Sequence, residues 1–356
     1  MSTMLADHTT LGLGGPAKAF HTASSTDELI RLVTEADRAG ERVLVLGGGS
    51  NLVVADDGFL GTVILVASQG VTLTEDGTDP ETGEDVVLLR ADAGVEWDPL
   101  VERTVAEGLN GVEFLSGIPG RVGSTPIQNV GAYGQDVSQT IREVLVLDRV
   151  TGERITMSNA DCGFTYRDSV FKGSDRHVVC EVVFELRRGP SSRPVRYAEV
   201  ARTMGVDAGD RVPLEKAREV VLGLRRGKGM VLDPADPDTR SAGSFFTNPV
   251  LSPEEYSAFR ERAAGRLGAE AEIPGHPDEA GNVKLSAAWL IDRAGFTKGY
   301  GDGPARISGK HTLALTNPGG ATTADLLDLA REVRAGVEKA FGVRLVNEPV
   351  MVGVSL

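Results

Sequence analysis

A glycine-rich segment with almost no charge, residues 110–136, constrains the fold of this chain most. A loop of this length without regular structure inside a compact domain usually has a function. Its apolar residues Ile118, Val122, Ile127 and Val130 are regularly interleaved and favour burial. The segment therefore predicts an ordered loop that wraps an extended ligand with main-chain donors, because an exposed glycine-rich connection would not need these apolar residues.

A shorter glycine run, Gly-Gly-Gly-Ser-Asn, occupies residues 47–51 directly after the apolar stretch 43–46, which predicts a strand. Consecutive glycines permit positive φ angles, and successive N–H groups of such a turn form an anion site. A tight turn without a ligand is the alternative. The run is neither a Walker A loop nor a Rossmann fingerprint, because no Gly-Lys-[Ser/Thr] follows and the next residues, 52–54, are extended in character.

Composition bounds the class of protein. The 356 residues, 41% hydrophobic and 25% charged, predict two or three globular domains. A net charge of −14 disfavours nucleic acid and anionic lipid as partners. We expect no membrane span and no signal peptide, hence a cytoplasmic protein, because no long apolar run occurs. Cys162 and Cys180 are interpreted as buried free thiols, and no metal is expected, because they have no metal-ligand spacing with the histidines.

Periodicity and capping residues predict the elements. Helices are expected at residues 25–39, 97–107, 213–225, 252–267, 286–294 and 322–341. Strands are expected at 43–46, 53–54, 62–66, 86–91, 141–148, 154–157, 177–186, 313–316 and 344–354. The polar stretch 68–85 predicts a hairpin tip or domain edge, and the Asp- and Pro-rich stretch 233–238 a domain boundary. Hairpins and helices without βα alternation favour the α+β class over a doubly wound parallel sheet.

Five motifs occur in a specific order and spacing, at residues 47–51, 119–134, 166–169, 243–249 and 347–349. In this respect residues 10–354 resemble the UDP-N-acetylenolpyruvoylglucosamine reductase family. The resemblance implies a two-part FAD-binding domain of the vanillyl-alcohol-oxidase/PCMH type and a smaller α+β substrate-binding domain. The expected division is 1–70 with 343–356, then 71–230, then 231–342.

The resemblance also implies the reaction and the cofactor. NADPH reduces a non-covalently bound FAD, whose N5 passes hydride to the enolpyruvyl C3 of a UDP-sugar, and a proton reaches C2. The product, UDP-N-acetylmuramate, is a peptidoglycan precursor. A monomer is expected. The implied FAD contacts are Gly47, Gly48, Gly49, Ser50, Asn51, Leu52, Ile118, Pro119, Gly120, Gly123, Ser124, Pro126, Gln128, Asn129, Gly131 and Ala132.

Three residues match the catalytic positions of the family. Ser244 resembles the proton donor, which must be closely aimed because a serine is a weak acid. Arg167 is of the type that forks onto a carboxylate, and Glu348 is expected to contact the same carboxylate with a raised pKa. Taken locally, each has a plainer interpretation: a serine that caps a turn, a surface ion pair with Asp168, and an exposed loop glutamate.

The implied substrate contacts are Tyr133, Tyr166, Tyr197, Lys228 and Asn248. Lys228 lies in a basic cluster, residues 225–228, that a diphosphate needs, although a solvated helix end is the alternative. Tyr197 suggests the subgroup with an inserted tyrosine loop, whereas Arg293 departs from subgroup members with glutamine there. Two other functions stay open: a different FAD-dependent oxidoreductase of this fold, and a nucleotide-binding protein without turnover.

Overall fold

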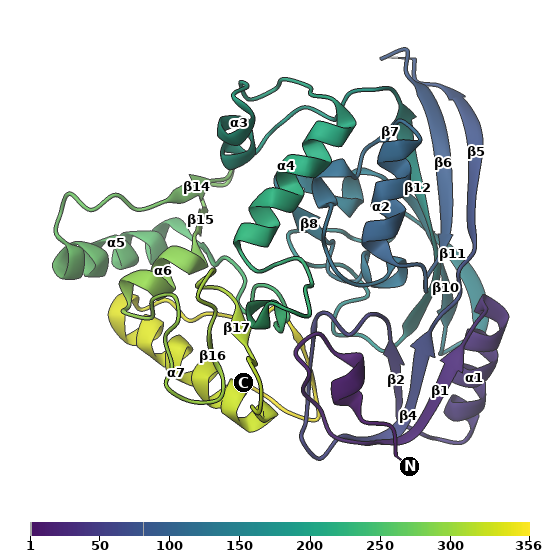
Figure 1. Ribbon diagram of the computed structural model, residues 1–356, viewed down its shortest axis with the longest axis horizontal. Coiled ribbons are helices and arrows are strands. Elements are labelled where there is room, and N and C mark those ends of the chain that lie inside the picture. The colour runs from purple at the N-terminus through teal and green to yellow at the C-terminus, as the bar shows by residue number, and fades with distance from the viewer. Residues whose placement is uncertain (1, 81) are drawn as a thin grey trace. The chain divides into compact units, whose positions relative to one another are not determined.

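The computed structural model describes residues 2–80 and 82–356, which form two compact units (Figure 1). Unit 1 comprises residues 2–3, Ala17–Gly49 and Leu60–Val231, and unit 2 comprises Met4–Pro16, Ser50–Phe59 and Leu232–Leu356. The break after Val231 lies close to the boundary expected at 233–238. The units do not separate residues 1–70 from 71–230, so the division into three domains stays a prediction.

The larger sheet of unit 1 is antiparallel and has the strand order β11-β10-β12-β6-β5, with β7 also paired to β12. Its strands are β5 (Val71–Thr78), β6 (Asp85–Asp92), β7 (Leu109–Asn110), β10 (Ile141–Asp148), β11 (Glu153–Ser158) and β12 (His177–Arg188). Figure 1 shows β5 and β6 as a long hairpin at the edge of this sheet. Of the two interpretations of 68–85, the β5–β6 hairpin agrees with the hairpin tip, and the hairpin expected at 141–157 is confirmed.

A second sheet of unit 1 has the order β1-β4-β2, with strands β1 (Ala17–Ala23), β2 (Val43–Leu46) and β4 (Phe59–Val66). Helix α1 (Thr26–Arg38) begins after Ser25, whose side chain accepts a hydrogen bond from the Glu28 amide. Its buried residues Leu29 and Val33 pack in one cluster with Ile64 and Cys180. Strand β2 is parallel to β4 and leads directly into the glycine run.

Three further helices complete unit 1: α2 (Trp97–Ala106), α3 (Ala198–Met204) and α4 (Leu214–Gly227). Trp97 is buried against Phe184 of β12 with ring centroids 5.6 Å apart, which fixes the start of α2 on the sheet. The glycine-rich segment forms two 3-10 turns and the short ladder of β8 (Gly131–Ala132) with β9 (Gln135–Asp136). It is therefore ordered, as the interleaved apolar residues predict.

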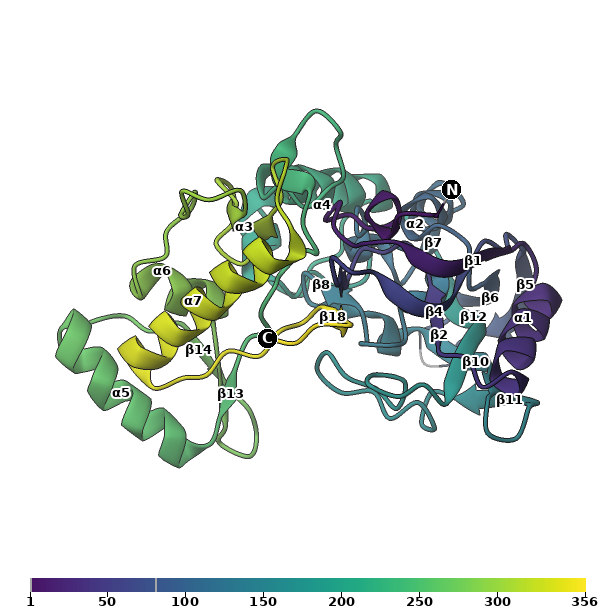
Figure 2. The ribbon, with the colours of Figure 1, turned by 90° about the horizontal axis from the view of Figure 1, so that it is seen from below.

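Unit 2 contains helices α5 (Pro253–Leu267), α6 (Ala287–Arg293) and α7 (Thr323–Phe341). Figure 2 shows α5 and α7 side by side, and Phe259 and Phe341 are in contact there with ring centroids 6.0 Å apart. The strands of unit 2 are β3 (Leu52–Val54), β13 (Val250–Leu251), β14 (Gly275–Pro277), β15 (Val283–Leu285), β16 (Arg306–Ile307), β17 (Leu315–Thr316) and β18 (Val350–Val352). The capping box expected at Ser252 and Glu255 is present.

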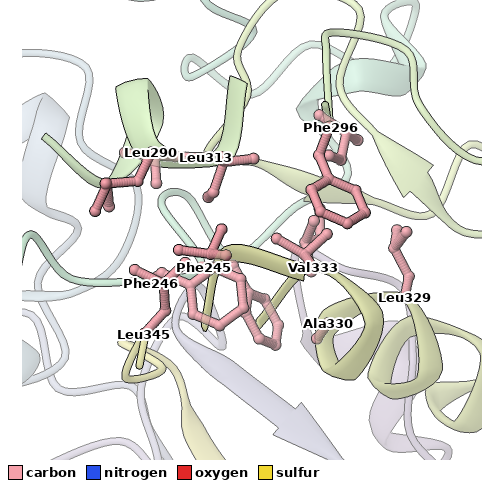
Figure 3. Packing of buried hydrophobic residues seen from close by; sticks show 14 of the residues in the cluster. Phe245, Phe246, Leu290, Phe296, Leu313, Leu329, Ala330, Val333 and Leu345 are labelled. Carbon is pink, nitrogen blue, oxygen red and sulfur yellow. The ribbon is translucent and has the colours of Figure 1, made fainter. Parts of the chain in front are cut away.

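The core of unit 2 is built around α7 (Figure 3). Val333 and Ala330 on α7 face Phe245, Phe246 and Leu313, all of them buried. The segment that contains Phe245 and Phe246 is thus held by the largest apolar cluster of the unit, and its backbone position follows from packing.

Some expected elements differ from the structure. Strands were expected across 344–354, but only Val350–Val352 pairs, in parallel with β3. Val343 and Leu345 are apolar because they are buried in the core, so their alternation reflects packing and not a ladder. Sequence analysis also missed β1 and α3. The burial pattern of β1 does not alternate, and α3 has only seven residues.

Gly336 in α7 offers a test of the packing in unit 2. A Cβ atom there would lie 2.2 Å from the ring of Phe296, which is itself buried. We expect Gly336→Ala to lower the free energy of unfolding by about 1–2 kcal/mol, because the overpacking exceeds the gain in helix propensity. Urea unfolding measures this change.

The control is Gly265→Ala in α5, where a Cβ atom meets nothing within 4 Å. This change should stabilise unit 2, by up to about 1 kcal/mol. Adding Phe296→Leu to Gly336→Ala should recover part of the loss. Equal effects of the two alanine substitutions would mean that Phe296 does not limit the packing.

Candidate active site

The two glycine-rich segments expected to act together are in contact within unit 1. A Cβ atom on Gly47 would lie 2.5 Å from the Ser124 hydroxyl oxygen, and one on Gly48 would lie 2.7 Å from the Cα atom of Gly120. A side chain could not be accommodated at Gly48, because the opposing atoms belong to the backbone. The close approach of the two loops therefore requires glycine at position 48, whereas a side chain at Gly47 would have to displace the Ser124 hydroxyl.

The second loop is fixed by hydrogen bonds to the segment after β6. The amide of Val122 donates to the carbonyl of Val95 at 2.9 Å, and the amide of Gly123 donates to Ala93 at 2.9 Å. A Cβ atom on Gly123 would lie 2.5 Å from that of Ala93. The backbone that faces the glycine run is therefore preorganised.

These features fit a dinucleotide cofactor with a diphosphate group. The close approach brings the backbones of the two loops together at Gly48 and Gly120, and Ser124 and Gln128 add polar groups from the second loop. Arg121 on the second loop has a buried Nη1 atom without a hydrogen-bond partner among residues 2–80 and 82–356. Ile118 and Ala132 pack against the core of the unit, so their role in the loop is at least partly structural.

Arg167 lies against the second loop and not in isolation on the surface. Its guanidinium donates to the carbonyl oxygens of Gly131 and, at 3.4 Å, of Asn129. The Asn129 amide in turn donates to the Thr165 carbonyl at 3.0 Å. Arg167 itself has a φ of +55°, which is uncommon for a residue with a side chain. The Arg167 turn is thus attached to the glycine-rich segment.

Three of the expected substrate contacts form one cluster in unit 1. The rings of Tyr133 and Tyr197 meet edge to face with centroids 5.4 Å apart, and the Lys228 Nζ atom lies 5.6 Å from the centroid of the Tyr133 ring. Lys228 also pairs with Glu199 of α3 at 2.6 Å. The lysine at the end of α4 is therefore partly buried in an aromatic and ionic setting, which differs from a solvated helix end.

Arg225 is a buried charged group that interacts electrostatically with Tyr133 of this cluster. It is 8% exposed, its Nη2 atom donates to the Met230 carbonyl at 2.9 Å, and burial lowers its pKa. Burial also raises the pKa of Tyr133 to about 12, with the charge of Arg225 acting against the shift. Sequence analysis assigned no role to Arg225 or Glu199. The basic cluster at 225–228 was a signal for the first, and nothing in the sequence marked the second.

Unit 2 contains Ser244 and Glu348, and a backbone contact brings their segments together. The amide of Glu348 donates to the carbonyl of Phe245 at 2.9 Å, and Phe246 forms a β-bridge with Asn347. Phe245 is 1% exposed, as is Phe246. Ser244 therefore precedes two residues anchored in the core shown in Figure 3.

Two other expected site residues make contacts in unit 2. The Asn51 side chain donates to the Glu348 carbonyl at 3.4 Å, and the Val350 amide donates to the Asn51 carbonyl at 2.9 Å. Asn248 accepts a hydrogen bond from the Ala287 amide at 2.9 Å, at the start of α6. Leu52 lies in β3, which pairs with β18. The remaining tyrosine, Tyr166, is exposed in unit 1 and its ring lies 5.2 Å from the Arg167 guanidinium carbon.

Comparison with known proteins identifies the class and then the family. Residues 17–158 match the FAD-binding domain family, and residues 234–352 match the C-terminal domain of UDP-N-acetylenolpyruvoylglucosamine reductase. The expected α+β fold with an FAD-binding part and a smaller C-terminal domain is confirmed, and the class is that of an FAD-dependent oxidoreductase.

Relatives of similar length support the same assignment. The UDP-N-acetylenolpyruvoylglucosamine reductase of Thermobifida fusca is 65% identical over 99% of this chain and 97% of its own length. That of Streptomyces coelicolor is 61% identical over 99% of this chain and 90% of its own. The crystal structure of the Thermus caldophilus enzyme has a TM-score of 0.65 at 26% identity and covers 99% of this chain and 98% of that one. This chain belongs to the UDP-N-acetylenolpyruvoylglucosamine reductase family.

Neither a membrane-spanning helix nor a metal-binding cluster occurs in the part of the chain that is described. No described helix is long and apolar enough to cross a membrane. No group of three or more His, Cys, Asp or Glu side chains among the described residues is arranged to hold a metal ion. Cys162 and Cys180 are both buried free thiols, as expected.

Gly48→Ala tests the close approach of the two loops. The added Cβ must move backbone atoms of Gly120, so we expect a lower melting temperature and a purified protein with less bound FAD. Gly223→Ala in α4 is the control, because a Cβ there meets nothing within 4 Å. Unchanged FAD content in Gly48→Ala would contradict a role for this contact in cofactor binding.

The raised pKa of Tyr133 predicts a pH dependence of stability. From about pH 10 to 12 the folded protein keeps a phenol proton that the unfolded chain releases, so stability is complete below this range and falls through it. Tyr133→Phe should reduce the fall in unfolding free energy between about pH 9 and about pH 11. Tyr256→Phe, which retains Tyr133, is the control. Equal slopes in both variants would refute the effect.

Proposed function

We propose that this chain is a UDP-N-acetylmuramate dehydrogenase, which reduces UDP-N-acetylglucosamine enolpyruvate to UDP-N-acetylmuramate with NADPH in peptidoglycan precursor synthesis. Family membership over 99% of the chain supports the substrate class. The observation that carries the proposal is the Phe245–Glu348 backbone bond, which holds a candidate proton donor and a candidate carboxylate in neighbouring segments.

FAD, when bound, supplies the hydride chemistry, since it accepts hydride from NADPH and passes it to the enolpyruvyl C3. The protein must bind the cofactor, hold the enolpyruvyl group and deliver a proton to C2. FAD is proposed to bind the residues that sequence analysis assigned to it, of which those at 47–49 and 118–132 belong to unit 1 and those at 50–52 to unit 2. The close approach of the two loops and their fixed backbone support this role.

Ser244 is proposed to deliver the proton. A serine hydroxyl is a weak acid, so it can act only when it is closely aimed at a strongly basic carbon. Gly243 has a φ of +73° and its amide bonds to the Ser241 hydroxyl at 3.2 Å, so a tight turn precedes Ser244. The buried Phe245 follows it. The hydroxyl therefore extends from a backbone that is restrained on both sides.

Arg167 and Glu348 are proposed to act on the enolpyruvyl carboxylate. A guanidinium binds a carboxylate in a bidentate manner and stabilises the additional charge that develops as hydride arrives at C3. Glu348 in contact with the same carboxylate would be repelled unless it carried a proton, so its pKa is predicted to be raised in the complex. This prediction concerns the complex with substrate.

The substrate is proposed to contact Tyr133, Tyr166, Lys228 and Asn248, with its diphosphate at Lys228, and Tyr197 is proposed to close over the nucleotide. The protein carries a net charge of −14, so a diphosphate requires a local cation. Lys228 lies 5.6 Å from the centroid of the Tyr133 ring and is partly buried, which makes its charge less screened than at the surface. No contact with the uridine or diphosphate is proposed for Arg293, because subgroup members carry glutamine at this position.

Further proposals concern the state of the protein: a monomer in the cytoplasm that binds neither nucleic acid nor membrane, with the three-domain division expected from sequence. The competing functions are another FAD-dependent oxidation of a different substrate, and nucleotide binding without turnover. Both predict that the enolpyruvyl UDP-sugar does not reoxidise the reduced flavin.

The test begins with the visible spectrum of the purified protein. A flavin spectrum should be bleached by NADPH in the absence of oxygen and should return when UDP-N-acetylglucosamine enolpyruvate is added. A colourless protein that also fails to bind added FAD would reject the flavin function. A bleached flavin that the enolpyruvyl substrate cannot reoxidise would reject the substrate.

Ser244→Ala should separate the two half-reactions. Flavin reduction by NADPH should proceed as in the unchanged protein, whereas reoxidation by the enolpyruvyl substrate should slow by about 10²–10⁴-fold, the usual contribution of a positioned acid. Stopped-flow absorbance measures both rates.

The matched control is Ser252→Ala, which removes the cap of α5 in the same unit and should cost stability of about 1 kcal/mol while both half-reactions persist. Equal losses in both halves of the Ser244→Ala reaction would argue against proton donation by this serine.

A further inference from the structure

Arg121 is the single charged residue in the two glycine-rich segments, residues 47–51 and 119–134. These segments contribute backbone amides, hydroxyls and side-chain amides, none of which carries a full charge. A diphosphate ligand is strongly anionic, and the chain as a whole has a net charge of −14. Arg121 therefore affects the electrostatic potential at these two segments more than any other residue in them.

The backbone on either side of Arg121 is fixed. The Trp97 amide donates to the Gly120 carbonyl at 3.0 Å, and the Val122 amide donates to the Val95 carbonyl at 2.9 Å. Arg121 itself forms a β-bridge with Glu96. The guanidinium thus extends from a clamped position beside the glycine run, because a Cβ atom on Gly47 would lie 3.9 Å from that of Arg121.

The Arg121 side chain is partly buried, and its hydrogen-bonding capacity is incomplete. The Nη1 atom is buried and has no hydrogen-bond partner in the chain as far as the structure describes it. Burial lowers the pKa of Arg121, and the charge of Glu96 acts against this shift. A buried donor without a partner costs free energy, so an acceptor on a ligand would stabilise this arrangement.

We propose that Arg121 binds the diphosphate of FAD and neutralises part of its charge. A guanidinium presents planar paired donors that match phosphate oxygens, whereas the neutral ring system and ribityl chain of the flavin offer no such charge. Arg121 is a binding residue and takes no part in proton or hydride transfer. The inference rests on the proposed flavin function.

The first test measures flavin binding to protein from which FAD has been removed. In Arg121→Met, which keeps an unbranched stem and loses the guanidinium with its charge and donors, the Kd for FAD should rise by about 10- to 100-fold. The Kd for riboflavin, which lacks the diphosphate, should stay the same. The Kd for FAD should also depend less on salt in this variant, because one charged contact is gone.

Arg103→Gln is the control for loss of a positive charge. Arg103 lies in α2, is exposed and pairs with Glu107 at 2.7 Å, so its replacement should leave both Kd values unchanged. Arg121→Lys should show an intermediate loss for FAD, because it keeps the charge and loses the fork. Circular dichroism shows whether Arg121→Met folds. If it does not, the Kd values for FAD and riboflavin are compared in Arg121→Lys instead.

The second test compares melting temperatures with and without FAD. If the guanidinium gains its hydrogen-bond acceptor only when the diphosphate binds, Arg121→Met should leave the flavin-free protein as stable as before or more stable. The same change should reduce the stabilisation that FAD gives. A purely structural arginine would instead lower both melting temperatures.

Tight FAD binding by Arg121→Met would overturn the inference, and so would an equal loss for FAD and riboflavin. A rise in the KM for NADPH with an unchanged Kd for FAD would also overturn it and place the guanidinium at the other dinucleotide. Failure of the unchanged protein to bind FAD at all would reject the flavin function itself, which keeps the two failures distinct.

Discussion

The close backbone contact between the two glycine-rich loops is the constraint that the rest of unit 1 must satisfy. Gly48 approaches Gly120 so closely that a Cβ atom would lie 2.7 Å from the opposing Cα atom. Such an approach requires that both partners be held from elsewhere. The first loop directly follows strand β2, which is paired with β4, and hydrogen bonds to Ala93 and Val95 hold the second loop. The sheets and helices of the unit can be understood as the support that keeps these two loops in place.

Some charged side chains of unit 1 make all their hydrogen bonds within the protein, whereas others keep a buried donor atom without an acceptor in the described part of the chain. Arg176 bonds twice to Asp148, whose pKa it lowers to about 2. Arg121 and Arg225, in contrast, each have a buried nitrogen without a partner among the described residues. Such groups cost stability of about 1–3 kcal/mol each. Their position, on the second glycine-rich loop and near Tyr133, is consistent with ligand binding as the compensation.

The sequence predicted those elements whose signals are local. Strand β2 and the α5 capping box follow from short patterns, and the structure reproduces both. Leu345, within the strand expected at 344–354, was misread as strand, because burial in a core and burial in a ladder produce the same pattern. Motif spacing pointed to Ser244 and Lys228. It did not reveal Glu199, since the 2.6 Å pair with Lys228 depends on the packing of α3 near α4, which no local pattern encodes.

Unit 2 positions its candidate acid by apolar packing. Phe245 and Phe246 are each 1% exposed, and the carbonyl of Phe245 also accepts the Glu348 amide. A Ser244 hydroxyl that donated to another protein group would have to break that hydrogen bond before it could act as the proposed acid. Anchoring the neighbours in the core restrains the serine and leaves its hydroxyl available. The same apolar cluster that stabilises α7 therefore sets the geometry that a weak acid requires.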